Sequence, residues 1–342
     1  MSDLNVAVIG VDHRHIYGQL EGMLSVGCTC KAWWTDGEPQ PVAGFVKRFP
    51  DIDRVSDRRT LLDDPEIDLV LIADIPARRA ARAIEAMRAG KDVMTDKPGC
   101  TTMDQLEDIK RTVAETGRIW SVDYSERFEV PVVAKAAQLV EQGAIGKVVQ
   151  TIGLGPHRLN RAMRPDWFFE RDRYGGILCD IASHQIDQFL FFTGSSDAEI
   201  VSSSVGNFAN PGDPGLEDFG EIVLRSSEGQ GYIRVDWYTP DGLPTWGDGR
   251  LTILGTEGYM ELRKYVDIAG RPGSDHLFLV NGSQCDYVDA SAVELTYFSD
   301  LAKDVSHRTE SAMSQDHCFK VMELALRAQE QASRLGNLKA PA

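Results

Sequence analysis

The chain has 342 residues, of which 42% are hydrophobic and 26% are charged, and its formal net charge is −16. This length is sufficient for two domains that each bury a core. The negative charge argues against non-specific binding to nucleic acid or to an anionic membrane surface. The balance of apolar and charged residues is typical of a soluble globular protein.

The six cysteines are scattered and form no C-x-x-C pair, so they show no zinc-site pattern. Isolated thiols are typical of the reducing cytoplasm. The N-terminus has no basic segment followed by an apolar run, which argues against a signal peptide. No apolar stretch approaches the roughly 20 residues of a membrane helix. We therefore expect a cytoplasmic protein.

The first third of the chain alternates strand and helix signals. Short apolar runs predict strands at residues 4–9, 29–35, 67–73, 92–95 and 119–124. Helical spacing predicts helices at residues 16–25, 77–89 and 102–116. This alternation predicts an α/β fold with a doubly wound parallel sheet that helices cover on both faces.

The pattern changes after Arg127. A helix is predicted at residues 130–142 and a strand at residues 148–154, and closing helices are predicted at 295–303 and 316–335. Between them lie runs of strand character, at residues 200–208, 221–225, 231–238, 250–254, 259–262 and 276–280. This second part is therefore predicted to be an α+β domain with an open, largely antiparallel sheet.

A predicted helix that follows Gly175-Gly176 carries a polar stripe. Asp180, His184 and Asp187 are spaced i, i+4 and i+7, which places them on one side of a helix. An imidazole beside a carboxylate on a rigid element is a candidate general base near neutral pH. The alternative is a capping or buried polar cluster without chemistry.

The turn after the first strand reads Gly10-Val11-Asp12-His13-Arg14-His15. In the dinucleotide-binding pattern G-x-G-x-x-G, the second glycine lets the backbone approach the pyrophosphate. Here Asp12 and His15 replace the second and third glycines, and a carboxylate repels a pyrophosphate unless Arg14 or the helix N-terminus compensates. The turn also holds metal-ligand residue types, but it offers too few converging ligands, so we expect no metal.

Two more polar residues follow predicted strands. Asp36 lies just past the second strand, where a carboxylate accepts the ribose hydroxyl of NAD; the alternative is a turn residue beside Gly37. Lys97 follows the fourth strand in Asp96-Lys97-Pro98, at the edge where α/β proteins bind ligands. Its ammonium group can donate to a substrate hydroxyl or to a developing alkoxide.

Together these motifs resemble the Gfo/Idh/MocA family, named after glucose–fructose oxidoreductase, inositol dehydrogenase and a rhizopine-catabolism protein. Asp96-Lys97-Pro98 is similar to the family's E-K-P motif, and residues 175–187 are similar to its G-G-x3-D-x3-H-x2-D motif. Further matches at residues 89–91, 127–128, 143–147 and 255–258 spread the resemblance over the whole chain. It implies a Rossmann domain over residues 1–124 and a substrate-binding and oligomerisation domain over residues 125–342.

The resemblance implies an NAD(P)-dependent oxidoreductase that transfers a hydride between a nicotinamide cofactor and a carbinol carbon of a sugar, sugar derivative or cyclitol. The implied catalytic residues are His184 as proton acceptor or donor, Asp180 as its assistant, and Lys97, which orients the substrate hydroxyl and stabilises oxyanion charge. Lys97, Arg127, Asp180 and His184 would bind the substrate. His157, at the end of a predicted strand, is a further candidate substrate contact, and the alternative is a surface loop histidine. We expect NAD, with NADP as the alternative, held by Gly10, Asp12, His13, Arg14, His15, Asp36, Asp74 and Lys97.

Two departures affect these expectations. The family's T-P-N-x-x-H turn aligns with residues 74–79, which read D-I-P-A-R-R, and Tyr174 stands where many members have a third glycine. Two other functions stay open: a redox-neutral glycoside lyase or hydrolase that retains NAD and acts through a keto-sugar, and a non-catalytic sugar or nucleotide sensor. The presence of the catalytic residues argues against a sensor, which needs no base.

Three aromatic residues, Trp237, Tyr238 and Trp246, flank a loop rich in proline and glycine. They could stack on a sugar ring or bury a subunit interface, and an open sheet with one bare face favours the interface. We therefore expect a homo-oligomer, a dimer or a tetramer, formed through the C-terminal sheet. The other expected partner is a small carbohydrate or cyclitol substrate, and neither nucleic acid nor a membrane is expected.

Overall fold

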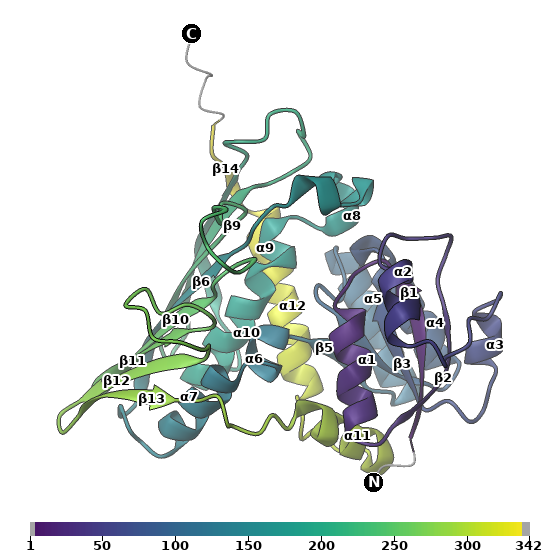
Figure 1. The fold of residues 1–342 in the computed structure, drawn as a ribbon, viewed down its shortest axis with the longest axis horizontal. Helices are drawn as coiled ribbons and strands as arrows, with labels where there is room; N and C mark the ends of the chain where they lie inside the picture. Colours follow the sequence, from purple (N-terminus) through teal and green to yellow (C-terminus); the bar gives the residue numbers. More distant parts are fainter. Residues whose placement is uncertain (1–3, 337–342) are drawn as a thin grey trace. The chain divides into compact units, whose positions relative to one another are not determined.

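The computed structural model describes residues 4–336, which form two compact units. The first unit contains the residues up to 123 and two later segments, 172–175 and 296–322. The second unit contains residues 124–171, 176–295 and those from 323 onward. The domain boundary predicted after residue 124 would place residues 172–175 and 296–322 in the second domain, whereas in the structure they belong to the first unit. Figure 1 shows the chain coloured along the sequence.

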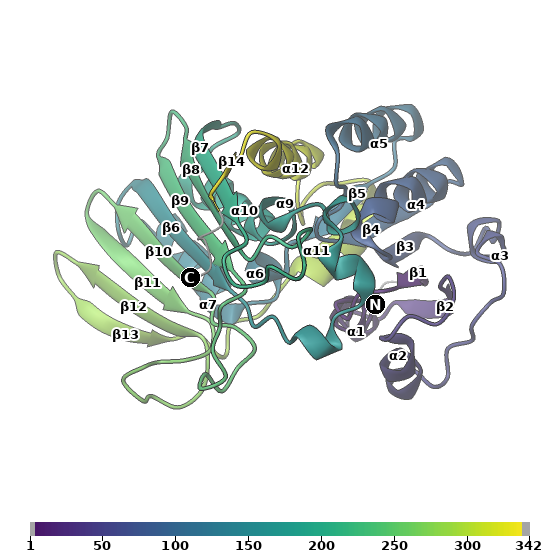
Figure 2. The same ribbon diagram turned by 90° about the horizontal axis from the view of Figure 1, so that it is seen from above.

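The first unit is built on a five-stranded parallel sheet with the strand order β2-β1-β3-β4-β5. Strands β3 and β4 are buried at every residue, because both faces of a doubly wound sheet are covered. Figure 2 shows α4 and α5 on one side of this sheet and α1 on the other. The predicted α/β fold is therefore confirmed. The bounds are β1 (Asn5–Val11), α1 (Ile16–Ser25), β2 (Thr29–Trp34), β3 (Leu69–Ala73), α4 (Pro76–Arg88), β4 (Asp92–Asp96), α5 (Met103–Thr116) and β5 (Trp120–Asp123).

The first unit also contains elements that the sequence patterns did not predict. They are the short helices α2 (Val42–Arg48) and α3 (Arg59–Leu62). Helix α11 (Tyr297–His307) packs against α1 so closely that a Cβ on Gly22 would lie 2.3 Å from the Phe298 ring. The tyrosine hydroxyl of Tyr297 is 2.8 Å from that of Ser121 on β5.

The second unit is built on a nine-stranded sheet with the order β13-β12-β11-β10-β6-β9-β8-β7-β14. The pairs β6–β9 and β14–β7 are parallel and the others are antiparallel, which confirms the predicted, largely antiparallel sheet. The strands are β6 (Val148–Pro156), β7 (Glu199–Gly206), β8 (Phe219–Arg225), β9 (Gln230–Asp236), β10 (Arg250–Gly255), β11 (Gly258–Arg263), β12 (His276–Asn281), β13 (Cys285–Asp289) and β14 (Ser333–Arg334). The predicted helix at 316–335 instead ends at Glu330 as α12 (Gln315–Glu330), and β14 follows it.

Helices lie along one face of this second sheet, as Figure 2 shows. Glycines at helix-facing positions let α10 approach closely: a Cβ on Gly153 would lie 2.7 Å from Gln185, and one on Gly231 would lie 2.8 Å from Phe189. The helices and short turns are α6 (Ser125–Phe128), α7 (Pro131–Glu141), η1 (Arg161–Met163), η2 (Asp166–Phe169), α8 (Arg171–Tyr174), α9 (Ile177–Asp180) and α10 (Ala182–Thr193).

The opposite face of the second sheet, hereafter the open face, has large side chains at alternate positions. Tyr259 on β11 and Leu254 on β10 are among the exposed large hydrophobic residues. None of the six cysteines, all within residues 4–336, forms a disulfide bond. None of the helices between residues 4 and 336 has the length and the apolar run that a membrane crossing needs.

Candidate active site

The turn between β1 and α1 holds most of the predicted cofactor residues. Gly10 has φ +85°, and a Cβ there would lie 2.6 Å from Asp74, so only glycine fits. The backbone N–H groups of Asp12 and His13 both donate to the carbonyl of Ala73, at 3.0 Å. The turn is therefore fixed to the carboxyl end of β3, where ligands bind in doubly wound sheets.

Asp12 is a buried carboxyl group at the position of the second glycine. Its side chain is 8% exposed, and its Oδ2 atom has no hydrogen-bond partner among the described residues. Burial, and then the neighbouring Asp74, raise the pKa of Asp12 to about 7, although Arg78 and Arg79 oppose this shift. Asp74 is better satisfied, because it accepts from Ile75 N at 2.7 Å and from Arg82 Nε at 2.9 Å. The Asp12 carboxyl group is therefore partly protonated at neutral pH.

Replacing Asp12 by asparagine should stabilise the protein at alkaline pH. The folded-state pKa of about 7 lies above the ordinary value of 3.8, so stability is fully present below about pH 4 and is lost as the pH rises through 7. The pKa is raised by about three units, and each unit corresponds to about 1.36 kcal/mol. The free energy of unfolding of the parent is therefore lower by up to about 4 kcal/mol at pH 8. Denaturant unfolding of Asp12→Asn and of the parent at pH 5 and pH 8 measures this, with Asp36→Asn as the exposed control. A difference that does not grow with pH would contradict the prediction.

Asp96, the last residue of β4, joins three cationic or imidazole groups. Its carboxylate oxygens lie 2.9 Å from His13 Nδ1, 2.8 Å from His15 Nδ1 and 2.8 Å from a terminal nitrogen of Arg79. Although burial disfavours its charge, Arg79 and the two histidines hold the pKa of Asp96 well below its usual range. Burial, and then the nearby His15, lower the pKa of His13 to about 4, so its imidazole is neutral at pH 7.

These residues include a set of metal-ligand atoms. His13, His15 and Asp96 offer ligand atoms within 4.8 Å of one another, the one such group in the described part of the chain. Arg79 already supplies positive charge to the same carboxylate. A metal ion at Asp96 would be repelled by this guanidinium. The absence of a metal stays a prediction, and the contacts describe a hydrogen-bonded network.

Arg79 on α4 holds the lysine motif in place. The side chain is 1% exposed, and one of its terminal nitrogens donates to the backbone carbonyls of Asp96, Lys97 and Pro98. Its Nε donates to the carbonyl of Asp74 at 2.8 Å. The sequence analysis missed this role, although Arg79 stands where the family's T-P-N-x-x-H turn has histidine. Lys97 itself is buried at the carboxyl end of β4.

Asp36 lies beyond the carboxyl end of β2 and is 63% exposed. Arg78 on α4 approaches it, with 3.4 Å between a guanidinium nitrogen and Oδ2. An aspartate at this place favours NAD, whereas an arginine beside it is the group that accommodates the 2′-phosphate of NADP. Both cofactors therefore find a matching side chain here.

The first unit fits a dinucleotide in three respects. Gly10 has the positive φ of the tight turn, Asp36 offers an acceptor, and α1 begins without an acidic residue in its first turn. The N–H groups of Ile16 and Tyr17 already donate to the carbonyls of His13 and Arg14, so α1 attracts a pyrophosphate mainly through its dipole. Arg14 in the same turn is exposed and adds positive charge.

The predicted catalytic motif of the second unit, Asp180 to Asp187, does not lie on one continuous helix, so the prediction of a single helix is wrong. Helix α9 ends at Asp180, and α10 starts at Ala182. His184 N donates to the carbonyl of Ile181 at 3.1 Å, and the Ser183 hydroxyl donates to the carbonyl of Asp180 at 3.3 Å. In an unbroken helix the Asp180 carbonyl would accept from His184 instead. Asp180 therefore marks the end of α9, and His184 lies in the first turn of α10.

His184 is 3% exposed and contacts a residue that the sequence analysis missed. The Tyr124 ring lies edge-on to the His184 imidazole, with 6.4 Å between the ring centroids. Tyr124 is fully buried and directly follows β5. Tyr124 lies three residues before the family match at Arg127-Phe128, and this nearness was the available signal. The contact restricts the orientation of the imidazole.

Asp187, the third member of the predicted stripe, pairs with Arg127 on α6. The guanidinium makes two hydrogen bonds to the carboxylate, both 2.7 Å long. It also packs over the rings of Phe128 and Phe191. This pair fixes α6 against α10, and contact between Arg127 and a substrate stays a prediction.

His157, which follows β6, lies in an aromatic cluster. Its ring centroid is 5.2 Å from that of Trp237 and 4.7 Å from that of Trp246, and its Nδ1 is 3.1 Å from the carbonyl of Gly155. Trp237 is buried within the unit, whereas Tyr238 and Trp246 are 39% and 42% exposed. Of the three predicted interface aromatics, only these two therefore present a large apolar surface.

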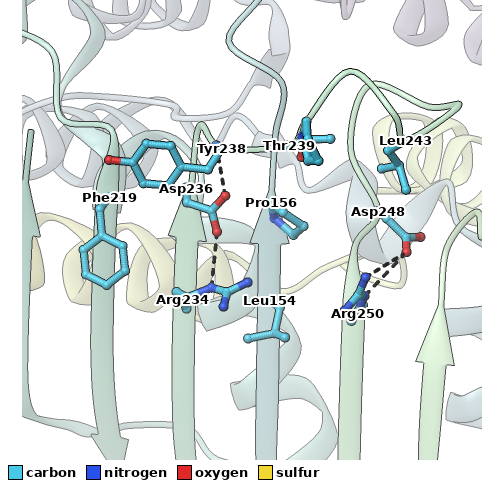
Figure 3. A pocket seen from close by; sticks show the side chains of 11 residues that line it. Leu154, Pro156, Phe219, Arg234, Asp236, Tyr238, Thr239, Leu243, Asp248 and Arg250 are labelled. Atoms are coloured by element: carbon cyan, nitrogen blue, oxygen red, sulfur yellow. Dashed lines mark hydrogen bonds and ion pairs between the residues drawn. The ribbon is translucent and has the colours of Figure 1, made fainter. Parts of the chain in front are cut away.

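A cavity of about 410 Å³ lies on the open face of the second sheet. Figure 3 shows Arg234 beside Asp236, and Arg250 beside Asp248. The two ion pairs measure 3.2 and 3.5 Å. None of the predicted catalytic residues lines this cavity, so it is separate from the proposed chemistry. Its lining residues are Leu154, Pro156, Phe219, Arg234, Asp236, Tyr238, Thr239, Pro240, Leu243, Asp248 and Arg250.

Comparison with family models gives two matches along the chain. Residues 35–124 match the model described as an oxidoreductase family with an NAD-binding Rossmann fold, and residues 133–261 match the GFO/IDH/MocA C-terminal domain. The turn at residues 10–15 lies outside the matched part. The turn has Asp12 and His15 where the usual pattern has glycine, which is consistent with a family match that begins only at residue 35.

Individual relatives agree with the family models. The chain is 26% identical to scyllo-inositol 2-dehydrogenase (NAD(+)) of Bacillus subtilis, over 71% of this chain and 70% of that protein. It is 31% identical to levoglucosan dehydrogenase of Pseudarthrobacter phenanthrenivorans, over 48% of this chain and 42% of that protein. A solved structure of an oxidoreductase from Erwinia carotovora atroseptica is similar with a TM-score of 0.95 and 44% identity, over 98% of this chain and all of that one. The chain therefore belongs to the Gfo/Idh/MocA family of oxidoreductases, and its first unit contains the NAD-binding Rossmann domain of that family.

Proposed function

We propose that this protein is a dehydrogenase that transfers a hydride between NAD(P) and a carbinol carbon of a sugar, sugar derivative or cyclitol. The observation that carries the proposal is the buried imidazole of His184, which lies in the first turn of α10, just after Asp180 ends α9. A buried imidazole at a helix start is suited to exchange one proton with a bound hydroxyl group. The names of the inositol and levoglucosan dehydrogenases support the substrate class.

The reacting groups have distinct roles. Oxidation of a carbinol removes a hydride from carbon and a proton from oxygen, and we assign that proton to His184. Asp180 contacts the substrate and assists the base. Lys97, which Arg79 holds at the carboxyl end of β4, orients the hydroxyl and stabilises its developing negative charge. In the reverse direction His184 returns the proton to the new alkoxide.

The cofactor, when bound, supplies the hydride acceptor. The residues proposed to hold it are Gly10, Asp12, His13, Arg14, His15, Asp36, Asp74 and Lys97. Gly10 permits the tight turn that carries these residues, and Asp36 accepts from a ribose hydroxyl. His13 and His15 are kept in position by Asp96 rather than by the glycines of the usual pattern.

A polyol screen with both nicotinamides tests this function. The purified protein is first denatured, and its supernatant is analysed by mass spectrometry for retained cofactor. A polyol-dependent change in the absorbance of reduced nicotinamide is expected. Conversion of a glycoside without added cofactor and without net reduction would instead indicate the redox-neutral lyase or hydrolase. Binding without turnover, unaffected by His184→Ala, would indicate a sensor.

We also propose that the protein forms a dimer or tetramer through the open face of the second unit. Exposed Leu254, Tyr259 and Tyr287 lie on this face, which no helix of the second unit covers in Figure 2. Apolar side chains in such number commonly mark an interface. Light scattering after size exclusion should give a multiple of the chain mass for the parent, and a lower multiple for Tyr259→Lys. A monomeric parent would overturn this proposal.

A further inference from the structure

We propose that Asp12 is a cofactor-positioning residue whose carboxyl group, in its neutral form, donates a hydrogen bond to the pyrophosphate of the dinucleotide. The inference rests on the proposed function. Binding would then take up a proton at alkaline pH. Asp12 would be a positive determinant of binding, although a carboxylate at this position of the turn is electrostatically unfavourable.

The geometry of the turn is the first argument. Asp12 occupies the position where the usual pattern has the glycine that approaches the pyrophosphate. Its backbone N–H donates to the Ala73 carbonyl, at 3.0 Å, so the backbone of the turn is held in place at this position. Its Oδ2 atom is buried and lacks a protein partner among the described residues. A buried polar atom without a partner is costly, and a ligand that pairs with it recovers that cost.

The charged groups around Asp12 supply the second argument. Asp74 after β3 and Asp36 after β2 face it with negative charge, while Arg78 and Arg79 on α4 face it with positive charge. The two arginines have other partners: Arg79 binds the Asp96 motif, and Arg78 lies 3.4 Å from Asp36. Neither forms an ion pair with Asp12 in the described residues. Burial beside Asp74 thus leaves protonation as the available way to neutralise this group, and its pKa is accordingly raised to about 7.

A protonated carboxyl is a hydrogen-bond donor as well as an acceptor. Phosphate oxygens accept strong hydrogen bonds, whereas an ionised Asp12 would repel them. Only the neutral form is therefore competent to bind the dinucleotide tightly. The apparent affinity is multiplied by the fraction of protein in that form.

Titration calorimetry with NAD between pH 6 and pH 8 tests the proposal. NAD is used because the 2′-phosphate of NADP would itself titrate near pH 6. With a pKa of about 7, affinity should be nearly constant below pH 6 and about tenfold weaker at pH 8 than at pH 6. Measurements in two buffers of different ionisation enthalpy should show uptake approaching one proton for each NAD at pH 8.

Three variants separate this role from the general effect of charge. Asp12→Asn keeps a donor without titrating, so its affinity should be flat with pH, without proton uptake, and within a few-fold of the parent at pH 6. Asp12→Gly should bind more weakly than Asp12→Asn at pH 6, whereas a role for space alone predicts tighter binding. Asp36→Asn, which removes the charge of the exposed carboxylate after β2, should keep the pH dependence of NAD affinity.

Each result decides the proposal. It would be overturned by a parent affinity that is flat with pH, by a slope that persists in Asp12→Asn, or by Asp12→Gly binding more tightly than the parent at pH 6. NAD binding without the pH dependence would remove this inference alone. A parent that binds NAD at no pH would remove the proposed function together with it.

Discussion

Replacing His184 by alanine should lower turnover with the substrate by about 10²–10⁴-fold, the usual contribution of a general base. The hydroxyl proton then has no positioned acceptor, and water must take its place. Binding of the nicotinamide cofactor should change little, because every cofactor residue proposed above lies in the first unit. Steady-state rates and direct cofactor titration of the same preparation measure both effects.

Two further variants make the His184 result decisive. His184 is 3% exposed, so alanine leaves a cavity, and His184→Asn tests the loss of the base with less loss of volume. His307→Ala removes an exposed histidine at the end of α11 and should leave turnover unchanged. Turnover of both His184 variants within a few-fold of the parent, with normal unfolding curves, would exclude His184 as the base.

The elements with strong periodicity were predictable from the sequence. The helix predicted at residues 16–25 has those bounds in the structure, and the strand predicted at residues 29–35 differs from β2 by one residue. Helix α1 buries one face, and β2 is buried at Ala32 and Trp33, so the local pattern records their environment. The motif after the fourth predicted strand likewise placed Lys97 at the carboxyl end of a strand, whereas the helix predicted through His184 is interrupted after Asp180.

What the sequence patterns missed depends on contacts between distant segments. The break after Asp180 coincides with the hydrogen bond from the Ser183 hydroxyl to the Asp180 carbonyl, and no proline or glycine signals it. Arg79 appeared to be one of several arginines on a helix, yet it alone reaches four backbone carbonyls. Strand β14 has only two residues and exists because β7 offers it an edge. Such features follow from tertiary structure and have no local period.

Replacing Arg79 by methionine should destabilise the protein by about 3–5 kcal/mol, the usual cost of removing one partner of a buried ion pair. Methionine is similar in length, so the loss of volume is small and the loss of the charge dominates. The carboxylate of Asp96 would stay buried without its guanidinium, and the carbonyls of Asp96, Lys97 and Pro98 would lose their donor. Denaturant unfolding at pH 8 measures the change.

The pH dependence of this variant identifies the cause. Without Arg79, the positive charge nearest the Asp96 carboxylate is lost, so protonation of His13 beside it becomes more favourable and the pKa of His13 should rise. A raised histidine pKa adds stability that is present at low pH and lost as the pH rises, so the deficit should be smaller at pH 5.5 than at pH 8. Arg88→Met, at an exposed position of the same helix, should change stability by less than about 1 kcal/mol. Equal losses in the two variants, or a deficit that is independent of pH, would show that Asp96 does not depend on Arg79 for its charge.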